Sequence, residues 1–148
     1  MTYDIAIQHV EPRPLAVAWG SASREALGDT IRGLLDRVWA VLRAQGVPTG
    51  HNVVLYPEGG LMNIEAGVEV FGPFQPTDEV RPSATPAGQA AVTSHWGDYA
   101  GLAAAHLAIG EWCAAHGRTP AGPTWEVYGD WHDDPQQVRT DVYVLLSP

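Results

Sequence analysis

The sequence predicts an α+β domain made of two tandem strand–helix–strand–strand modules related by a pseudo-twofold axis. Two segments with apolar residues at helical spacing occupy corresponding places in the halves of the 148-residue chain. One extended segment precedes each helix and two strand-like segments follow it, so a largely antiparallel sheet is expected. Each half alone leaves one sheet face open, which favours packing them side by side with a ligand groove between the repeats.

The first module, about residues 1–74, opens with the extended stretch DIAIQHVEPRPLAVAWG. The helix is predicted in SREALGDTIRGLLDRVWAVLRAQG, where Ser23 can cap the start and Gly46 can end it. HNVVLYPEGG and LMNIEAGVEVFG are the two strands that follow. The apolar residues at helical spacing are Leu27, Ile31, Leu34, Leu35, Val38 and Leu42.

The second module, about residues 80–148, begins with the extended segment PAGQAAVTSHWG. Its helix, GDYAGLAAAHLAIGEWCAAHG, is expected to start at Asp98 and to end at Gly117, and the strands PTWEVYGDW and VRTDVYVLLSP follow. The connector GPFQPTDEVRPSATP is too short to separate independent domains, so residues 1–148 form one domain. The apolar stripe of this helix is Leu102, Ala105, Ile109, Trp112 and Cys113.

Composition excludes several classes of function. Apolar residues make up 45% of a chain whose net charge is −9, and its eight positive side chains, all arginine, form no cluster for a phosphate backbone. We therefore expect a globular protein without nucleic acid as a direct partner. No apolar run reaches the length of a membrane span and MTYDIAIQHVEPRP is no signal peptide. With a single cysteine, Cys113, these features predict a cytoplasmic protein without a membrane partner.

An acid interrupts the apolar strand TWEVYGDW. Alternation puts Trp125 and Val127 on one face and Glu126 and Tyr128 on the other, so Glu126 can lie on the wet face of a half-buried strand. Aligning the two modules places Val54 opposite Glu126, so the fold does not itself require the acid.

The second module resembles the GyrI-like small-molecule-binding family. The resemblance rests on an ordered set: the Pro-x-Gly strand start, the helix start in SHWGDYAGL, Trp112 late in the helix, and the Glu-x-Tyr strand with Asp134-Pro135 after it. It covers about residues 82–148 strongly. Over the first half it rests on the internal repeat, AWGSASREAL and MNIEAGVEV.

The resemblance implies a groove between two modules that binds amphipathic, cationic aromatic compounds, with Glu126 inside it. Some members are effector-binding domains of multidrug-sensing regulators. This chain has no room for a DNA-binding domain and is expected to be a stand-alone version that senses or sequesters such compounds in drug resistance. A minority of stand-alone members are similar to hydrolases of cyclopropane-bearing DNA-alkylating natural products, which here would use Glu126 and Tyr128. A partly desolvated acid can pair with a cation or act as a general base, so both functions stay open.

Further residues are candidates for the groove. Tyr128 shares the face of Glu126, Tyr56 is its counterpart in the first module, and Trp39 and Trp125 are assigned to the core. His95 is either a hydrogen-bonding residue at the helix start or part of the site. The remaining ligand-binding candidates are Trp19, Trp96, Phe71 and Trp112.

No cofactor and no metal are predicted, because HExxH, CxxC, P-loop and GxGxxG motifs are missing from the sequence. Ser94, His95 and Asp98 stand too close together for a hydrolase triad, and His132, Asp133 and Asp134 are assigned to a solvated turn. A third possibility is a module that binds a protein through its exposed sheet edge, but no motif identifies such a partner.

Overall fold

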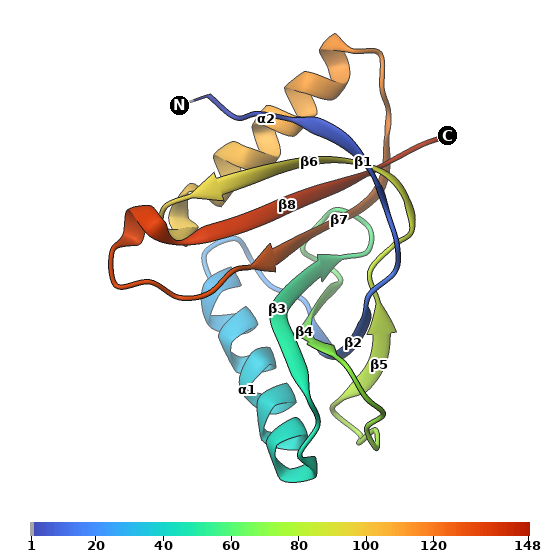
Figure 1. Cartoon of the computed structure of the whole chain (residues 1–148), viewed down its shortest axis with the longest axis vertical. Coiled ribbons are helices and arrows are strands. Elements are labelled where there is room, and N and C mark those ends of the chain that lie inside the picture. Colours follow the sequence, from blue (N-terminus) through green and yellow to red (C-terminus); the bar gives the residue numbers. More distant parts are fainter. Residues whose placement is uncertain (1) are drawn as a thin grey trace.

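The computed structural model describes residues 2–148 and consists of one eight-stranded sheet with two α-helices (Figure 1). The helices are α1 (Leu27–Gln45) and α2 (Leu102–Ala115), with short 3₁₀ helices η1 (Tyr99–Gly101) and η2 (Pro135–Gln137). The strands are β1 (Ala6–Val10), β2 (Pro14–Gly20), β3 (Thr49–Tyr56), β4 (Ile64–Val70), β5 (Arg81–Ala84), β6 (Gly88–Trp96), β7 (Pro120–Tyr128) and β8 (Arg139–Leu146).

The strands lie in the order β1-β6-β8-β7-β3-β4-β2-β5, and neighbouring strands are antiparallel throughout. This confirms the predicted α+β fold class. The pair β3–β7 stands in the middle of the sheet, where the strand that follows α1 meets the strand that follows α2. Helix α2 contacts β6 and β8, and helix α1 contacts β2 and β4. Figure 1 shows the two helices beside opposite halves of the sheet.

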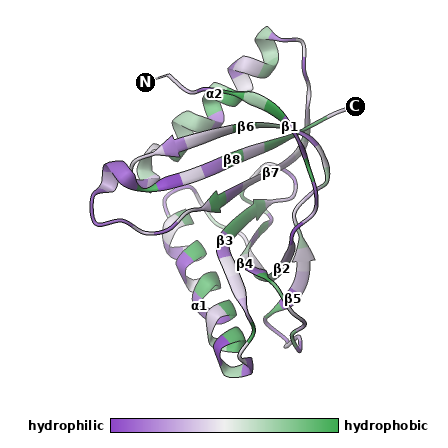
Figure 2. Ribbon diagram, viewed as in Figure 1, coloured by the Kyte–Doolittle hydropathy of each residue, from purple (hydrophilic) through white to green (hydrophobic). Residues whose placement is uncertain are grey.

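Helix α1 covers one part of the sheet through a single apolar face. Leu34, Val38 and Leu42 are buried against β2, β3 and β4, and Figure 2 shows apolar and polar residues alternating along the helix. Gly46 ends the helix with φ of 66°, as predicted, because glycine adopts this left-handed conformation without steric cost. Ser23 does not cap α1. It accepts the N–H of Ala26 in a turn before the helix.

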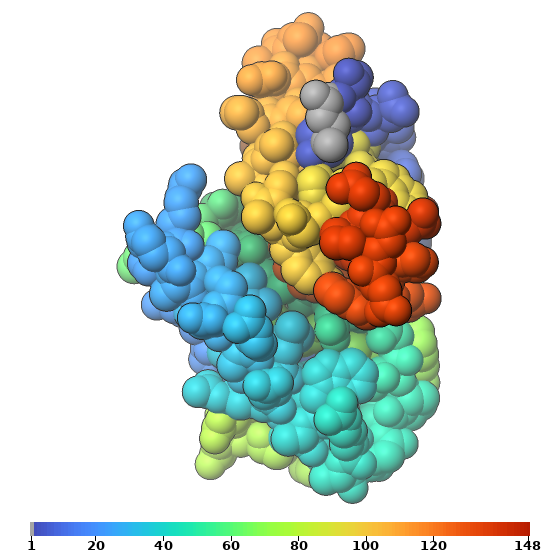
Figure 3. Space-filling view, turned by 90° about the vertical axis from the view of Figure 1, so that its left-hand side faces the viewer, coloured from blue at the N-terminus to red at the C-terminus, as the bar shows by residue number. Residues whose placement is uncertain are grey.

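Helix α2 packs on β6 and β8 through Leu102, Ala105, Ile109 and Cys113, four of the five residues of the predicted stripe, while Trp112 is partly buried beside them. The chain enters α2 through η1, and the side chain of Asp98 makes no capping hydrogen bond. Figure 3 shows α1, blue to cyan, in the lower half of that view and α2, orange, at the top. Within residues 2–148, neither helix is long and apolar enough to cross a membrane.

The opposite face of the sheet is apolar as well, although no helix residue belongs to its core. Leu15, Val17, Val53, Trp125 and Tyr143 are buried there, contributed by β2, β3, β7 and β8. Trp125 and Tyr143 stack with their ring centroids 5.1 Å apart. Both faces of the central strands are therefore buried, so a side chain on either face of β7 can be removed from water.

Two expectations about the strands are wrong. The Pro-rich connector contains β5, which extends the sheet beyond β2, and Val80 before it is fully buried. The first extended stretch is two strands: β1 pairs with β6, and β2 pairs with β4 in the other half of the sheet. Pro12 lies in the gap between the two strands and Pro14 is the first residue of β2, a strand position that tolerates the missing backbone N–H of proline.

Candidate functional site

Glu126 is buried on the face of β7 that turns toward the helices. As alternation predicts, Trp125 and Val127 join the core of the helix-free face, whereas Tyr128 contacts both helix-side cores. Glu126 is only 4% exposed, so the interpretation that it lies on a wet face is wrong. Its direct neighbour across the β3–β7 pair is Val54.

Two side chains hold the carboxylate of Glu126. The hydroxyl of Tyr128 donates to Oε1 at 2.8 Å, and Nε2 of His106 donates to Oε2 at 2.7 Å. His106 stands on α2, so this contact joins the helix to the centre of the sheet. The His106 side chain is 29% exposed against 5% for Glu126, which places the imidazole nearer to solvent than the acid that it covers.

Aromatic rings surround this pair. Tyr56 on β3 meets the His106 ring edge-on with centroids 6.4 Å apart, and Tyr99 in η1 lies 5.3 Å from the ring of Tyr128. We call these five residues (Glu126, His106, Tyr56, Tyr99 and Tyr128) the Glu126 cluster. Four separate elements contribute to it: β3, η1, α2 and β7.

The two inner tyrosines of the Glu126 cluster are held neutral. Burial raises the pKa of Tyr56 and of Tyr128 above the usual value, and the negative charge of Glu126 raises both further. A phenol that resists ionisation remains a hydrogen-bond donor.

Thr140 lies beside the same cluster on β8, across from Tyr128 on one side and His95 on the other. It is fully buried, and its Oγ1 has no hydrogen-bond partner anywhere in residues 2–148. Buried hydroxyls are nearly always partnered, so Thr140 Oγ1 is an exception among the described residues.

The Glu126 cluster holds a buried carboxylate between two hydrogen-bond donors. A buried carboxylate is costly unless it is paired, and here its partners are a neutral phenol and an imidazole that is itself partly exposed. An organic cation would neutralise Glu126 while its rings pack on the tyrosines. The same carboxylate could also take a proton from water.

Tyr56 and Tyr128 are thus brought together with Glu126, whereas three other predicted site residues lie elsewhere. Trp19 and Trp96 fall on the helix-free face by strand alternation, under Arg81 and Arg139 respectively. Phe71 follows β4, is 68% exposed and packs on Gly50.

His95 and Trp112 lie on the helix side but do not contact the acid in the described hydrogen bonds and ring pairs. The Nε2 of His95 donates to the backbone carbonyl of Asp98, and its Nδ1 accepts from the hydroxyl of Tyr3. His95 therefore fastens the start of α2 to the N-terminal segment. Trp112 stacks on His116 with ring centroids 4.3 Å apart.

Sequence reasoning missed His106, Tyr99 and Thr140. His106 follows Leu102 by four residues and precedes Ile109 by three, so helical spacing puts it on the buried stripe beside them. That spacing was the available signal. Nothing local in the sequence indicates that Tyr99 stacks on Tyr128, because the contact depends on how η1 is placed over the sheet.

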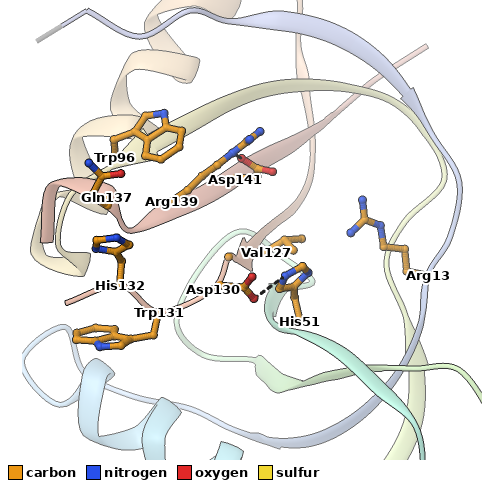
Figure 4. A pocket seen from close by; sticks show the side chains of 11 residues that line it. Arg13, His51, Trp96, Val127, Asp130, Trp131, His132, Gln137, Arg139 and Asp141 are labelled. Atoms are coloured by element: carbon orange, nitrogen blue, oxygen red, sulfur yellow. Dashed lines mark hydrogen bonds and ion pairs between the residues drawn. The ribbon is translucent and has the colours of Figure 1, made fainter. Parts of the chain in front are cut away.

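A pocket of about 500 Å³ opens on the helix-free face and not at the Glu126 cluster. We call it the Trp96 pocket. Figure 4 shows Trp96, Gln137, His132 and Trp131 toward one end and Arg13 at the other. Residues 129–138, between β7 and β8, provide much of its wall. Its principal polar and aromatic lining residues are Arg13, His51, Trp96, Trp131, His132 and Arg139.

Neither a Ser-His-Asp triad nor a metal site is formed by the candidate residues among residues 2–148. Ser94 donates to Asp141 on the face opposite His95, so Ser94, His95 and Asp98 form no triad. No group of three or more His, Cys, Asp or Glu side chains among residues 2–148 is arranged to hold a metal ion.

Comparisons with known proteins give the same family as the sequence motifs. The family described as the GyrI-like small molecule binding domain matches residues 24–147. No curated protein matches the sequence.

Solved structures with the same fold cover nearly the whole chain. EcmrR in its DNA complex has a TM-score of 0.85 at 17% identity over 98% of this chain, which spans only 57% of that EcmrR chain. The EcmrR C-terminal domain alone has a TM-score of 0.83 at 17% identity, with 99% of each chain covered.

Two further structures are more distant in sequence. A hydrolase from Listeria innocua has a TM-score of 0.65 at 8% identity, covering 97% of this chain and 91% of that one. SAV2435 bound to tetraphenylphosphonium has a TM-score of 0.66 at 12% identity, covering 99% and 94%. At sequence identities of 8% and 12%, the similarity of these structures shows a shared fold only.

Proposed function

Because this chain belongs to the family of GyrI-like small molecule binding domains, we propose that it binds amphipathic aromatic cations at the Glu126 cluster. The observation that carries the proposal is a carboxylate only 4% exposed, held by Tyr128 and His106 among tyrosine rings. The binding of tetraphenylphosphonium by SAV2435, which shares the fold, supports this class of ligand.

The position of the Glu126 cluster favours a groove between two modules. It lies where β7 of the second module pairs with β3 of the first, and we propose that a pseudo-twofold axis passes between these strands. Tyr56 and Tyr128 would then be symmetry counterparts on either side of the acid. The proposed site keeps Glu126, Tyr56 and Tyr128 from the sequence and adds His106 and Tyr99.

In this proposal the protein senses or sequesters hydrophobic drugs in the cytoplasm. Its single cysteine, Cys113, is a buried free thiol, as suits a reducing compartment. Eight arginines against seventeen acids give no attraction for nucleic acid, so the direct partners are small molecules.

The test is a fluorescence titration with tetraphenylphosphonium and, as a neutral match of similar shape, triphenylphosphine oxide. We expect saturable binding of the cation that is at least about tenfold tighter than binding of the neutral compound. Equal affinities would remove the charge-pairing account, and no binding of either would remove the proposed function.

A second candidate function is hydrolysis of cyclopropane-bearing aromatic alkylators. Thr140 Oγ1, orphaned and buried beside Tyr128, offers a place for a water molecule near Glu126. Glu126 would take a proton from that water, whose oxygen would bond to one cyclopropane carbon as the strained C–C bond breaks. The electron pair of that bond would move into the conjugated system of the alkylator, which would then take up the proton held by Glu126. The protein incubated with excess substrate should then yield the product of water addition; substrate unchanged after many equivalents rejects this function.

A further inference from the structure

We propose that the Trp96 pocket is a second binding site, selective for flat aromatic anions. It is separate from the Glu126 cluster in position and opposite to it in charge preference. Val127 lines the pocket, whereas its strand neighbours Glu126 and Tyr128 point to the other face of the sheet. The two sites therefore lie back to back across β7.

The rings of the pocket are exposed to an unusual degree for tryptophan. Trp96 is 49% exposed at the end of β6, and Trp131 is 70% exposed in the segment between β7 and β8. Tryptophan gains most from burial, and exposed aromatic rings that border a concave surface favour stacking of a flat ligand. Figure 4 shows His132 and Gln137 at the same end of the pocket as both rings.

Two of the eight arginines of this acidic chain line the pocket, and each retains free donors. The Nε–H of Arg139 donates a hydrogen bond to Asp141 at 2.8 Å, and one Nη–H of Arg13 donates to Glu69 at 3.4 Å. A guanidinium has five N–H donors, so one such bond leaves most of them available. Their side chains are 52% and 44% exposed.

The acids next to these arginines are already bonded. Asp141 also accepts from the hydroxyl of Ser94, and Glu69 also accepts from the backbone N–H of His51. Asp130, the remaining acid of the lining, is 97% exposed and lies 3.3 Å from the ring of His51. An incoming cation would therefore compete with arginine for Asp141 and Glu69, whereas Asp130 is paired only with a histidine.

His132 adds a further donor. Its Nδ1 accepts the backbone N–H of Asp134 at 3.0 Å, so the proton of the neutral ring resides on Nε2. Together with the arginines, this gives the pocket more available donors than acceptors. Donors between tryptophan rings suit a planar acid, whose anionic group accepts hydrogen bonds while its ring stacks.

The probe for this site is naphthalene-2-sulfonate, compared with neutral 2-methoxynaphthalene and with a cationic naphthyl-trimethylammonium. The six indole N–H signals in a ¹⁵N–¹H spectrum, assigned with Trp→Phe variants, report where each compound binds. We expect the sulfonate to shift the signals of Trp96 and Trp131 and to bind at least about fivefold more tightly than the other two compounds.

Three variants and one control test which residues are responsible for sulfonate binding. Arg139→Gln should weaken sulfonate binding at least about fivefold, while the exposed control Arg24→Gln should not. Trp131→Ala, in an exposed segment, tests stacking without disturbing the core and should weaken all three compounds. Glu126→Gln should leave sulfonate binding unchanged, which separates this site from the Glu126 cluster.

The proposal is overturned if the Trp96 and Trp131 signals stay fixed at millimolar sulfonate, or if neutral and anionic compounds bind equally. Equal losses in Arg139→Gln and Arg24→Gln would also overturn it, because binding would then follow net charge alone. A melting curve for each variant confirms that Arg139→Gln is folded; if it is not, Trp131→Ala with the three compounds decides.

Discussion

Tyr128 and His106 each donate a hydrogen bond to one carboxylate oxygen of Glu126. The two donors differ in chemical type and in the element that carries them. The phenol of Tyr128 is neutral and lies on the same strand as the acid, whereas the imidazole of His106 covers the acid from a different element and is 29% exposed. A cation that approaches from solvent therefore meets His106 first. We expect it to replace or share the His106 contact and to leave the Tyr128 contact in place.

Tyr128→Phe tests the inner hydrogen bond. The change leaves the ring and removes the donor to Oε1, so the buried carboxylate loses one of its two partners. We expect the free energy of unfolding to fall by about 1–2 kcal/mol and the affinity for aromatic cations to hold or rise. Denaturant unfolding measures the first quantity. The matched control is Tyr99→Phe, whose 46% exposed side chain should leave stability within about 0.5 kcal/mol.

The same residues predict a dependence of stability on alkaline pH. Burial first, and Glu126 second, raise the pKa of Tyr56 and Tyr128 above the usual 10.0, so the folded protein keeps protons that the unfolded chain releases. Their stabilising contribution is full below pH 10 and is lost as pH rises beyond it. Thermal melting from pH 8 to 11 should show this decline, and Tyr56→Phe should reduce it. An identical pH profile in Tyr56→Phe would contradict the assignment.

At the scale of elements, helices were predicted better than strands. The apolar spacing of α1 and α2, and Gly46 after α1, depend on local sequence and were correct within a few residues. The edge strand β5 was missed because RPSA has no alternation of its own; it is held by pairing with β2. The separation of β1 from β2 also depends on distant residues. Strand β1 pairs with β6 and strand β2 pairs with β4, and both partners lie more than forty residues away in the sequence.

Gly67 gives an element-scale prediction. It sits in β4 between Val17 and Val53, and a Cβ there would collide with the backbone carbonyl of Ala16. Gly67→Ala should therefore lower the free energy of unfolding by at least about 2 kcal/mol, because the backbone cannot move aside cheaply. The control is Gly33→Ala on the exposed face of α1, where a Cβ meets nothing within 4 Å. That change should stabilise the protein by about 0.5–1 kcal/mol, and equal effects of both changes would refute the packing argument.

At the scale of the whole molecule, the sheet presents two different chemistries on its two faces. The helix side buries one acid among tyrosines, and the helix-free side opens a pocket with arginine and tryptophan. Sequence reasoning grouped Glu126, Tyr56 and Tyr128, and the structure brings these three residues together on the helix side. It also grouped Trp19 and Trp96 with them, whereas strand alternation places both on the helix-free face.

Helical spacing places His106 on the buried face of α2, but its contact with Glu126 follows only when two elements are combined, since Glu126 lies on a strand twenty residues later. Thr140 is a similar case: its position between His95 and Tyr128 follows from the register of β8, which the sequence does not specify. Local patterns predict which face a residue takes, whereas the partners on that face depend on strand order and helix placement.

The most direct test of the central claim is the affinity of Glu126→Gln for tetraphenylphosphonium and for triphenylphosphine oxide. This change keeps the size of the side chain and removes its charge. If Glu126 neutralises a bound cation, phosphonium affinity falls about ten- to a hundredfold, roughly 1.5–3 kcal/mol, while the affinity for the neutral compound barely changes. Unchanged phosphonium affinity, in a variant whose melting curve shows it to be folded, would contradict the account.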